Sequence, residues 1–169
     1  KIIADAGLVG LPNAGKSSLL NALTHAKSKV GDYPFTTLSP HLGDFYGRIL
    51  ADIPGLIEGA SFGRGLGIKF LKHVERTGII LHLVSADQDD PVVAYREVQK
   101  EIELFGHGLA NKQEIIILSK IDLISSAKCE TKVQLLTRET GREVLTVSVE
   151  DPKAFKVFAD RLTKILIVA

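Results

Sequence analysis

The sequence predicts an α/β fold with a mainly parallel sheet and helices on both faces. Four short apolar runs are typical of strands buried on both sides, and segments with helical periodicity lie between them. Strands that alternate with helices form parallel sheets joined by right-handed crossovers. The four expected strands are residues 8–9 with a lead-in from residue 2, 79–84, 115–118 and 144–147.

Two expected helices have clear starting signals. Asp90 and Asp151 are each followed by a proline, so each can cap a helix that begins at the proline. Apolar residues then recur every three or four positions and share one helix face. These residues are Tyr95, Val98, Ile102 and Phe105 before the stop signals Gly106 and Gly108, and Phe155, Phe158, Leu162 and Ile165 in the second helix.

Residues 41–53 depart from this alternation. Two short extended pieces, HLGDFY and RILADI, meet around Gly47 and predict an antiparallel hairpin at one edge of the sheet. The length of 169 residues predicts a single domain, residues 1–169, with a full core.

The composition is 45% hydrophobic and 24% charged, as in an ordinary soluble globular protein. A net charge of +1 gives no reason to expect sequence-specific DNA binding. No apolar run approaches the roughly 18 to 20 residues of a membrane helix. The lone Cys129 cannot form an internal disulfide, which fits a reducing compartment. We expect a cytoplasmic location of bacterial type, with an organelle as the alternative, and separately we expect a monomer. Because methionine is absent, we expect a piece of a longer protein.

A phosphate-binding loop is predicted after the first strand. GLPNAGKS, residues 10–17, matches G-x-x-x-x-G-K-[ST], in which backbone N–H groups and a helix N-terminus face phosphates. Lys16 would reach the β- and γ-phosphates, and the Ser17 hydroxyl would bind Mg²⁺. The alternative is a glycine-rich turn with an exposed lysine, which the flanking apolar strand and the helical SLLNALTHA disfavour. The expected contacts are Gly10, Leu11, Pro12, Asn13, Ala14, Gly15, Lys16, Ser17 and Ser18.

Two later segments fit a sensor for the γ-phosphate. A threonine in the loop of residues 33–38 can complete the Mg²⁺ shell, while Asp52 can hold a Mg²⁺-bound water and Gly55 can donate its N–H. Taken alone, each segment could be an ordinary loop or turn. Glycines at 59, 63, 65 and 67 suit a loop that orders on the γ-phosphate, or a merely flexible surface loop. The expected contacts are Phe35, Thr36, Thr37, Asp52, Ile53, Pro54 and Gly55.

Four segments, GLPNAGKSSLLNALT, DYPFTTLSPHLG, ADIPGLIEGAS and GLGIKFLKHVERT, resemble the G domain of the Obg (CgtA) family of ribosome-associated GTPases. The resemblance covers essentially the whole chain. It implies the P-loop NTPase fold of a Ras-like G domain, GTP and GDP as ligands with Mg²⁺, and a switch role in large ribosomal subunit assembly and related growth or stress control. It places the metal-binding threonine at Thr37, beside Ser17 and Asp52. Family members also carry a glycine-rich N-terminal domain and often a C-terminal domain, and neither is found in residues 1–169, as expected for a piece of a longer protein.

Slow hydrolysis is expected because Leu56 occupies the position where many GTPases carry a glutamine that orients water. Even Ras, which has that glutamine, turns over on the order of 10⁻⁴ s⁻¹ unaided. The resemblance implies that Asn13 helps bind K⁺, whereas the alternative is that an asparagine there simply suits a turn. The expected catalytic residues are Lys16, Thr37, Gly55 and Asn13.

Three other polar residues are candidates for catalytic groups. Arg64 and Arg76 could act as internal arginine fingers, but solvated surface positions are the favoured interpretation. His82 lies inside an apolar strand, so we expect a hydrogen-bonded core residue rather than a base.

A guanine-reading turn is predicted at the end of the strand in IIILSKIDLI, residues 115–124. Asp122 can accept two hydrogen bonds from guanine that adenine cannot supply, and the stem of Lys120 can lie across the base. Ser119 stands where such turns usually carry asparagine, and its hydroxyl is too short both to contact the base and to tie the turn to the phosphate loop. We therefore expect weakened guanine affinity with preserved preference. The expected contacts are Ser119, Lys120, Ile121 and Asp122, with Ser148, Val149 and Glu150 from a second loop.

Two other classes of protein remain open from the residues alone. An ATP-using kinase would need an acceptor site and an arginine-bearing lid, and the sequence offers neither. A module that holds a nucleotide and scarcely hydrolyses it differs from a slow GTPase only in rate.

Overall fold

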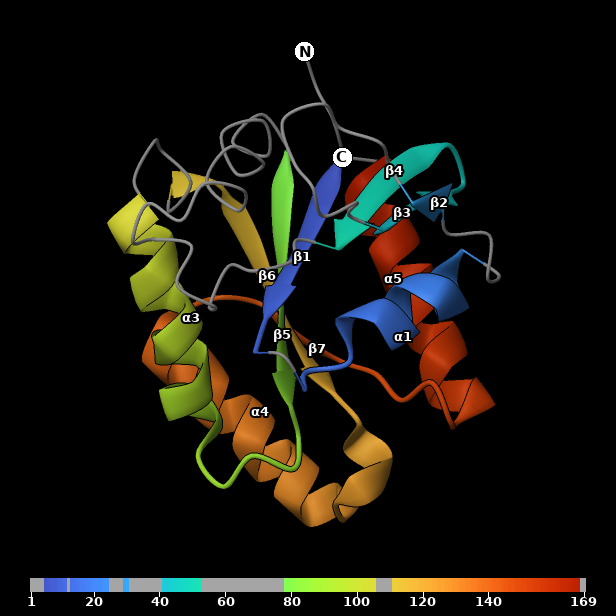
Figure 1. Ribbon diagram of the computed structural model, residues 1–169. Helices are drawn as coiled ribbons and strands as arrows, with labels where there is room; N and C mark the ends of the chain where they lie inside the picture. The colour runs from blue at the N-terminus through green and yellow to red at the C-terminus, as the bar shows by residue number, and fades with distance from the viewer. Residues whose placement is uncertain are drawn as a thin grey trace.

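The computed structural model describes residues 5–11, 13–24, 29–30, 41–52, 78–105 and 111–167. Its centre is a seven-stranded sheet in the order β2-β3-β4-β1-β5-β6-β7 (Figure 1). The strands are β1 (Ala6–Gly10), β2 (Lys29–Val30), β3 (His41–Phe45), β4 (Arg48–Asp52), β5 (Ile79–Ser85), β6 (Gln113–Ser119) and β7 (Val144–Thr146). The helices are α1 (Lys16–Leu23), α3 (Pro91–Phe105), α4 (Ser126–Thr140), α5 (Pro152–Ile167) and the short 3₁₀ helix η3 (Ile121–Leu123).

Most of the sheet is parallel. Strands β4, β1, β5, β6 and β7 run in one direction, and Leu8 of β1 lies opposite Leu81 of β5. Strand β3 pairs antiparallel with β4, and the two-residue β2 pairs antiparallel with β3. The predicted α/β class with its antiparallel edge hairpin is confirmed, whereas β2 was not predicted. The hairpin turns at Tyr46 and Gly47, which both have positive φ, as a type I′ turn requires.

The helices cover both faces of the sheet, with α1 and α5 on one face and α3 and α4 on the other (Figure 1). Because successive residues of a strand point to opposite faces, the sheet carries two cores. One core contains Leu20 of α1, Leu81 of β5 and Phe158 of α5. The other contains Tyr95 of α3 and Leu136 of α4.

Both predicted helix starts are confirmed. The Asp90 carboxylate accepts the backbone N–H of Val92 at 3.0 Å, and the Asp151 carboxylate accepts that of Lys153 at 3.0 Å. Each cap satisfies an N–H group that has no partner within the helix.

Helix α4 was missed in the sequence because most of its residues are exposed and only Leu136 is fully buried, which leaves a weak apolar periodicity. Its ends do carry signals. The Ser125 hydroxyl accepts the backbone N–H of Lys128 at 3.2 Å, and Gly141 ends the helix in the left-handed conformation at φ 68°.

Strands β5 and β6 extend beyond the apolar runs that predicted them. Pairing between β5 and β6 continues to Ser85 opposite Ser119, so both strands end on buried polar residues. Strand β7 stops at Thr146, one residue earlier than expected, although the Val147 N–H still donates to the Leu118 carbonyl at 3.0 Å. In the part of the chain that the structure describes, no helix combines the length and the apolar character needed to cross a membrane.

Candidate nucleotide-binding site

The predicted site residues that the structure describes gather at the carboxyl ends of the parallel strands, where α/β sheets bind their ligands. The ends of β1, β4 and β6 supply Gly10, Asp52 and Ser119. Several predicted residues lie outside the described residues, so their placement stays a prediction. They are Pro12, Phe35, Thr36, Thr37, Ile53, Pro54 and Gly55, together with Leu56, Arg64 and Arg76.

The predicted phosphate loop curls tightly after β1. The Ala14 N–H donates to the Leu11 carbonyl at 2.9 Å. A Cβ atom on Gly10 would lie 2.7 Å from the Leu83 carbonyl oxygen, so that position requires glycine. Gly15 has φ 89°, a conformation that L-residues with side chains rarely adopt. Helix α1 begins directly afterwards at Lys16, so the loop leads into a helix N-terminus, where the first N–H groups have no partners within the helix.

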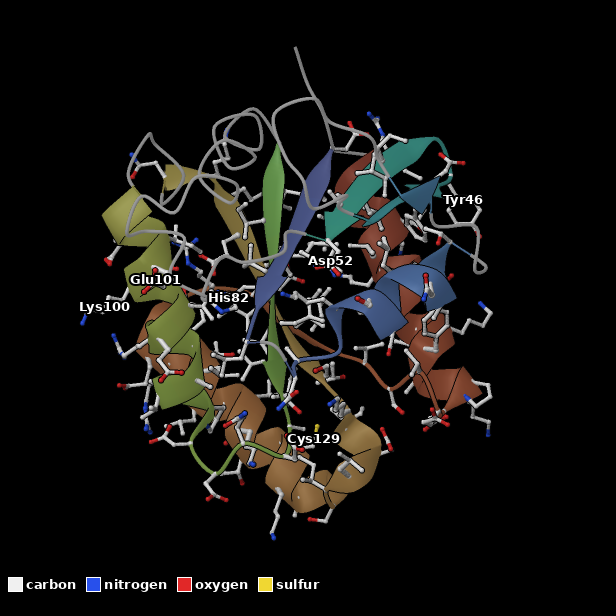
Figure 2. All side chains as sticks on the ribbon, viewed as in Figure 1. Tyr46, Asp52, His82, Lys100, Glu101 and Cys129 are labelled. Atoms are coloured by element: carbon white, nitrogen blue, oxygen red, sulfur yellow. The ribbon has the colours of Figure 1, made fainter. Side chains whose placement is uncertain are left out.

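Lys16, Ser17 and Asp52 form a polar group beneath this loop. The Ser17 hydroxyl donates to Asp52 Oδ2 at 2.8 Å, and Lys16 Nζ lies 3.8 Å from Asp52 Oδ1 and 3.3 Å from the Gly10 carbonyl. Asp52 is 8% exposed, and its Oδ1 has no hydrogen-bond partner among the described residues. Its side chain lies toward α1 (Figure 2). The Ser17 hydroxyl lies beside a buried carboxylate, one oxygen of which accepts no hydrogen bond within the described part of the chain. Two such oxygen groups could bind Mg²⁺, which prefers oxygen ligands.

Ser119 ties the predicted base-reading turn to the phosphate loop. Its hydroxyl donates to the Ala14 carbonyl at 2.7 Å and approaches the Val84 carbonyl at 3.4 Å, in a position only 4% exposed. We expected a hydroxyl to be too short for two tasks. The task that Ser119 performs here is the structural one, because its oxygen is buried against backbone carbonyls.

Lys120 makes a second tie. Its ammonium donates to the Asn13 carbonyl at 2.7 Å. The end of its aliphatic stem lies 3.5 Å from where a Gly15 Cβ would be, so the stem runs alongside the loop. Lys120 also adopts a left-handed backbone at φ 59°, which costs a non-glycine residue about 1–2 kcal/mol. Residues held in such conformations cluster at functional sites.

Asp122 is held in its orientation by the second predicted loop, residues 148–150. The Ser148 hydroxyl, which is 1% exposed, donates to Asp122 Oδ1 at 2.7 Å and accepts the backbone N–H of Glu150 at 3.1 Å. Asp122 itself is exposed. A buried serine therefore holds one carboxylate oxygen and leaves the carboxylate open to a ligand.

A cavity of about 300 Å³ lies between these elements. Its volume is at the lower end of the range found for small-molecule sites. Leu19, Leu123 and Val147 line it and were not predicted, and Leu123 is 57% exposed. Ile121 packs instead toward the core beneath α4. The full lining is Gly15, Ser18, Leu19, Ser119, Lys120, Asp122, Leu123, Val147, Val149 and Glu150.

His82 lies away from this site, toward α3 (Figure 2). It is fully buried, and its Nδ1 lies 2.7 Å from Glu114 Oε2. The His82 ring stacks on Tyr95 with centroids 4.5 Å apart. The expectation that His82 is a hydrogen-bonded core residue is confirmed.

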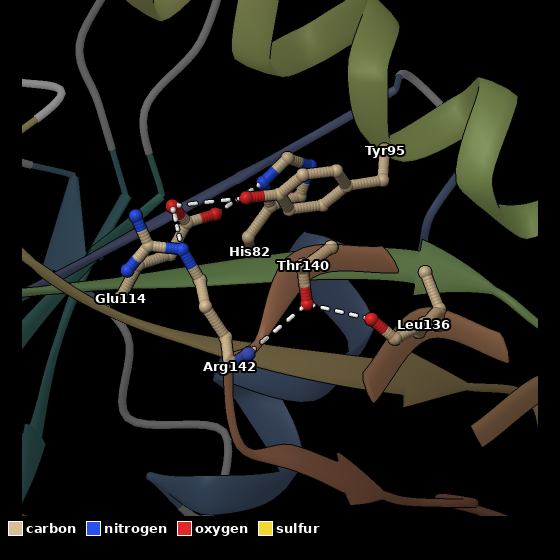
Figure 3. Close-up of polar contacts among 6 residues, drawn as sticks. All are labelled: His82, Tyr95, Glu114, Leu136, Thr140 and Arg142. Atoms are coloured by element: carbon tan, nitrogen blue, oxygen red, sulfur yellow. Dashed lines mark hydrogen bonds and ion pairs between the residues drawn. The ribbon is translucent and has the colours of Figure 1, made fainter. Parts of the chain in front are cut away.

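Glu114 is the centre of a polar cluster, which we call the His82 cluster (His82, Tyr95, Glu114 and Arg142; Figure 3), in which only Arg142 is partly exposed. The Tyr95 hydroxyl donates to Glu114 Oε1 at 3.4 Å, and Arg142 Nε lies 3.4 Å from the same oxygen. Burial, followed by the nearby Glu114 carboxylate, raises the pKa of Tyr95 to about 12. The Arg142 backbone is held by the Thr140 hydroxyl at the end of α4.

Comparison with protein families supports the assignment made from the motifs. Residues 5–120 match the family model described as "50S ribosome-binding GTPase". GTPase Obg 2 and GTPase Obg 1 of Anaplasma marginale (strain St. Maries) are each 54% identical to the chain over 155 residues. The alignments cover 89% of this chain and 47% and 44% of the two relatives. The chain thus spans about half the length of the curated relatives it matches.

Solved structures share the fold. A GDP-bound point mutant of S. thermophilus NFeoB superposes with a TM-score of 0.69 at 22% identity, covering 97% of this chain and 60% of that one. The elongation factor SelB from Methanococcus maripaludis, in complex with GppNHp, gives 0.65 at 16% identity, covering 98% and 33%. The predicted G-domain fold is therefore confirmed. Since the family model covers more than half of the chain, the protein belongs to the 50S ribosome-binding GTPase family, and the resemblance to Obg GTPases is confirmed.

Proposed function

We propose that this chain binds GTP and GDP with Mg²⁺ and hydrolyses GTP slowly to GDP and phosphate. The observation that carries the proposal is the pair of ties between the base-reading turn and the phosphate loop. Ser119 bonds Ala14 and Lys120 bonds Asn13, so the two halves of a nucleotide site are held at a fixed separation.

Guanine selectivity rests on Asp122. Its carboxylate accepts the ring N–H and the exocyclic amine of guanine, whereas adenine has no amine there and would present a lone pair to the carboxylate. Ser148 already holds one carboxylate oxygen, so less orientational freedom is lost when the base binds. The buried Ser148 hydroxyl and the exposed Asp122 carboxylate support this division of tasks.

Mg²⁺ fits the Ser17 hydroxyl and the Asp52 carboxylate, with Thr37 as the further ligand that the family resemblance implies. When bound, the ion would supply positive charge that offsets the negative charge developing on the phosphates. The chain contributes Lys16 as a second positive charge for the same phosphates. Asp52 Oδ1 accepts no hydrogen bond from the described residues, and this is the feature that favours a metal at this point.

Asn13 is proposed as part of a K⁺ site that supplies positive charge, because Leu56 cannot orient water. Asn13 is exposed on the phosphate loop, and its backbone carbonyl is already held by Lys120. A fixed backbone with an exposed amide side chain suits a residue that contributes an oxygen to a bound cation. The alternative, an asparagine that merely suits the turn, predicts a turnover that does not depend on K⁺. The Gly55 N–H completes the proposed catalytic set.

We further propose that the protein acts as a nucleotide-dependent switch in large ribosomal subunit assembly and related growth or stress control. The family description and the Obg relatives support this role. The large ribosomal subunit would then be the partner of the full-length protein, in the cytoplasm, with the G domain as a monomer.

Nucleotide competition followed by turnover tests the proposal. Labelled GTP should be displaced by GTP and GDP but not by a large excess of ATP, and GTP turnover should be slow in NaCl and faster in KCl. Equal displacement by ATP would contradict guanine selectivity, and equal rates in the two salts would remove the K⁺ site. Lys16→Ala should weaken nucleotide binding by roughly 100-fold or more, the scale of lost charge-assisted bonds to two phosphates.

A further inference from the structure

Lys132 on α4 clamps the loop that leads from β5 into α3. Its ammonium donates to the Ala86 carbonyl at 2.7 Å and to the Gln88 carbonyl at 2.6 Å, in a partly buried position. In Figure 1 this loop passes beside α4. A charged donor with two short bonds to backbone carbonyls is a strong, specific contact rather than a solvated surface lysine.

The clamped loop is bonded directly to the base-reading turn. The Ala86 N–H donates to the Ser119 carbonyl at 2.7 Å, and Ser119 in turn donates its hydroxyl to Ala14. Three consecutive hydrogen bonds thus connect Lys132 to the phosphate loop through Ala86 and Ser119.

The loop also carries negative charge. Residues 86–90 read ADQDD and carry three aspartates. Asp87 accepts the Ser85 hydroxyl and Asp90 caps α3, so two of these carboxylates are held close to the backbone that Lys132 binds. The Lys132 ammonium offsets this negative charge while it fixes the carbonyls.

We infer that Lys132 is a positioning residue for guanine recognition, an inference that rests on the proposed function. It holds the loop of residues 86–88 so that Ala86 fixes the backbone of Ser119, from which the Lys120–Asp122 turn projects. Lys132 lines no part of the base cavity. Its loss should weaken contacts to the base more than contacts to the phosphates, because the phosphate loop is also shaped by its own backbone at Gly10 and Gly15.

The test compares affinities for GDP and ADP, since both nucleotides use the phosphate loop and only GDP is read by Asp122. Lys132→Met should lower GDP affinity roughly 5- to 20-fold, less than the full loss of two bonds to a charged group because Lys132 acts on the base only through Ala86 and Ser119, while ADP affinity changes less than about 2-fold. Lys132→Arg, which can donate to both carbonyls, should restore GDP affinity. Lys132→Gln, which keeps a neutral donor, should give an intermediate loss and serves if the methionine variant does not fold.

Lys128 provides the matched control. It lies one turn earlier on α4, is exposed, and among the described residues its ammonium has no hydrogen-bond partner. Lys128→Met should leave both affinities unchanged. Unchanged GDP affinity in Lys132→Met, or an equal fall for GDP and ADP, would overturn the inference, the second outcome indicating a role in stability alone. The GDP and ADP affinities of the unmodified chain are measured first. If that chain does not prefer GDP to ADP, the proposed function itself fails, independently of any result with the Lys132 variants.

Discussion

Strands β5 and β6 carry two polar regions that differ in what their side chains contact. His82 in the middle of β5 and Glu114 near the start of β6 are buried on the α3 side of the sheet and bond each other in the His82 cluster. At the carboxyl ends, Ser85 and Ser119 lie opposite each other, and Ser119 bonds the phosphate loop. The two regions are separated by only a few residues along each strand.

The difference shows what makes a polar residue available to a ligand. A mid-strand side chain points into a core, so it must find a partner among its neighbours or lose hydration without compensation. A side chain at the strand end can instead anchor a loop, and the next residues of the chain then face solvent. Histidine is the usual candidate for a catalytic base. His82, however, lies in the middle of a strand, so its side chain is buried in the core.

The largest expected effect is on nucleotide selectivity and comes from Asp122, in the turn that follows the end of β6. Asp122→Asn should remove the preference for GTP over ATP, because the amide cannot accept both guanine donors. Two bonds to a charged group of about 1.5–3 kcal/mol each predict a loss of roughly 3–6 kcal/mol in discrimination. Competition of labelled GTP by ATP measures it, with thermal unfolding as the control for folding. A variant that still excludes ATP would show that another residue reads the base.

Substitutions in the His82 cluster should lower the stability of the protein and leave its preference for GTP over ATP unchanged. Glu114→Ala leaves His82, Tyr95 and Arg142 without their shared acceptor, and breaking such a buried pair costs about 3–5 kcal/mol. Urea unfolding measures this loss. Glu114→Gln, which keeps an acceptor, should cost less, and the folded fraction of either variant should retain its preference for GTP. A change in preference would mean that the two regions are coupled.

Alkaline titration examines the same cluster in the unmodified chain. Tyr95 has its pKa raised to about 12, so between pH 10 and pH 12 the unfolded chain loses this proton while the folded chain keeps it. Its contribution to stability is therefore fully present below pH 10 and is lost as the pH rises toward 12, by roughly 2–3 kcal/mol.

Because lysines also titrate in this range, the comparison is with Tyr95→Phe. The free energy of unfolding of the unmodified chain should fall more steeply between pH 10 and pH 12 than that of the variant. Parallel curves would count against the raised pKa.

The smallest effect is expected at Ser119. Asparagine there can keep the bond to Ala14 and also reach the base, so Ser119→Asn should tighten GDP binding by roughly 3- to 10-fold, about 1 kcal/mol. Ser119→Ala removes the tie and should weaken binding instead. No change in GDP affinity with asparagine would show that the base contact is not the element that serine lacks.

Much of the framework follows from local sequence. The strands were predicted from apolar runs, two helices from Asp-Pro starts, and the hairpin from the turn at Gly47, because these signals depend on neighbouring residues. The phosphate loop is equally local, since Gly10 and Gly15 are required by backbone geometry. The membership of the family was also evident from the motifs.

The relations within the site were decided by tertiary structure. Ser119 and Ala14 are 105 positions apart, and Ser148 and Asp122 are 26 apart, so no local pattern pairs them. The clamp by Lys132 on Ala86 spans 46 positions and has no motif at all. The sequence by itself determined which loops could hold phosphate and base. The packing of α1 and α4 against the sheet decided which side chains lock those loops together, because hydrogen bonds of this kind form only between groups that the fold brings within about 3 Å.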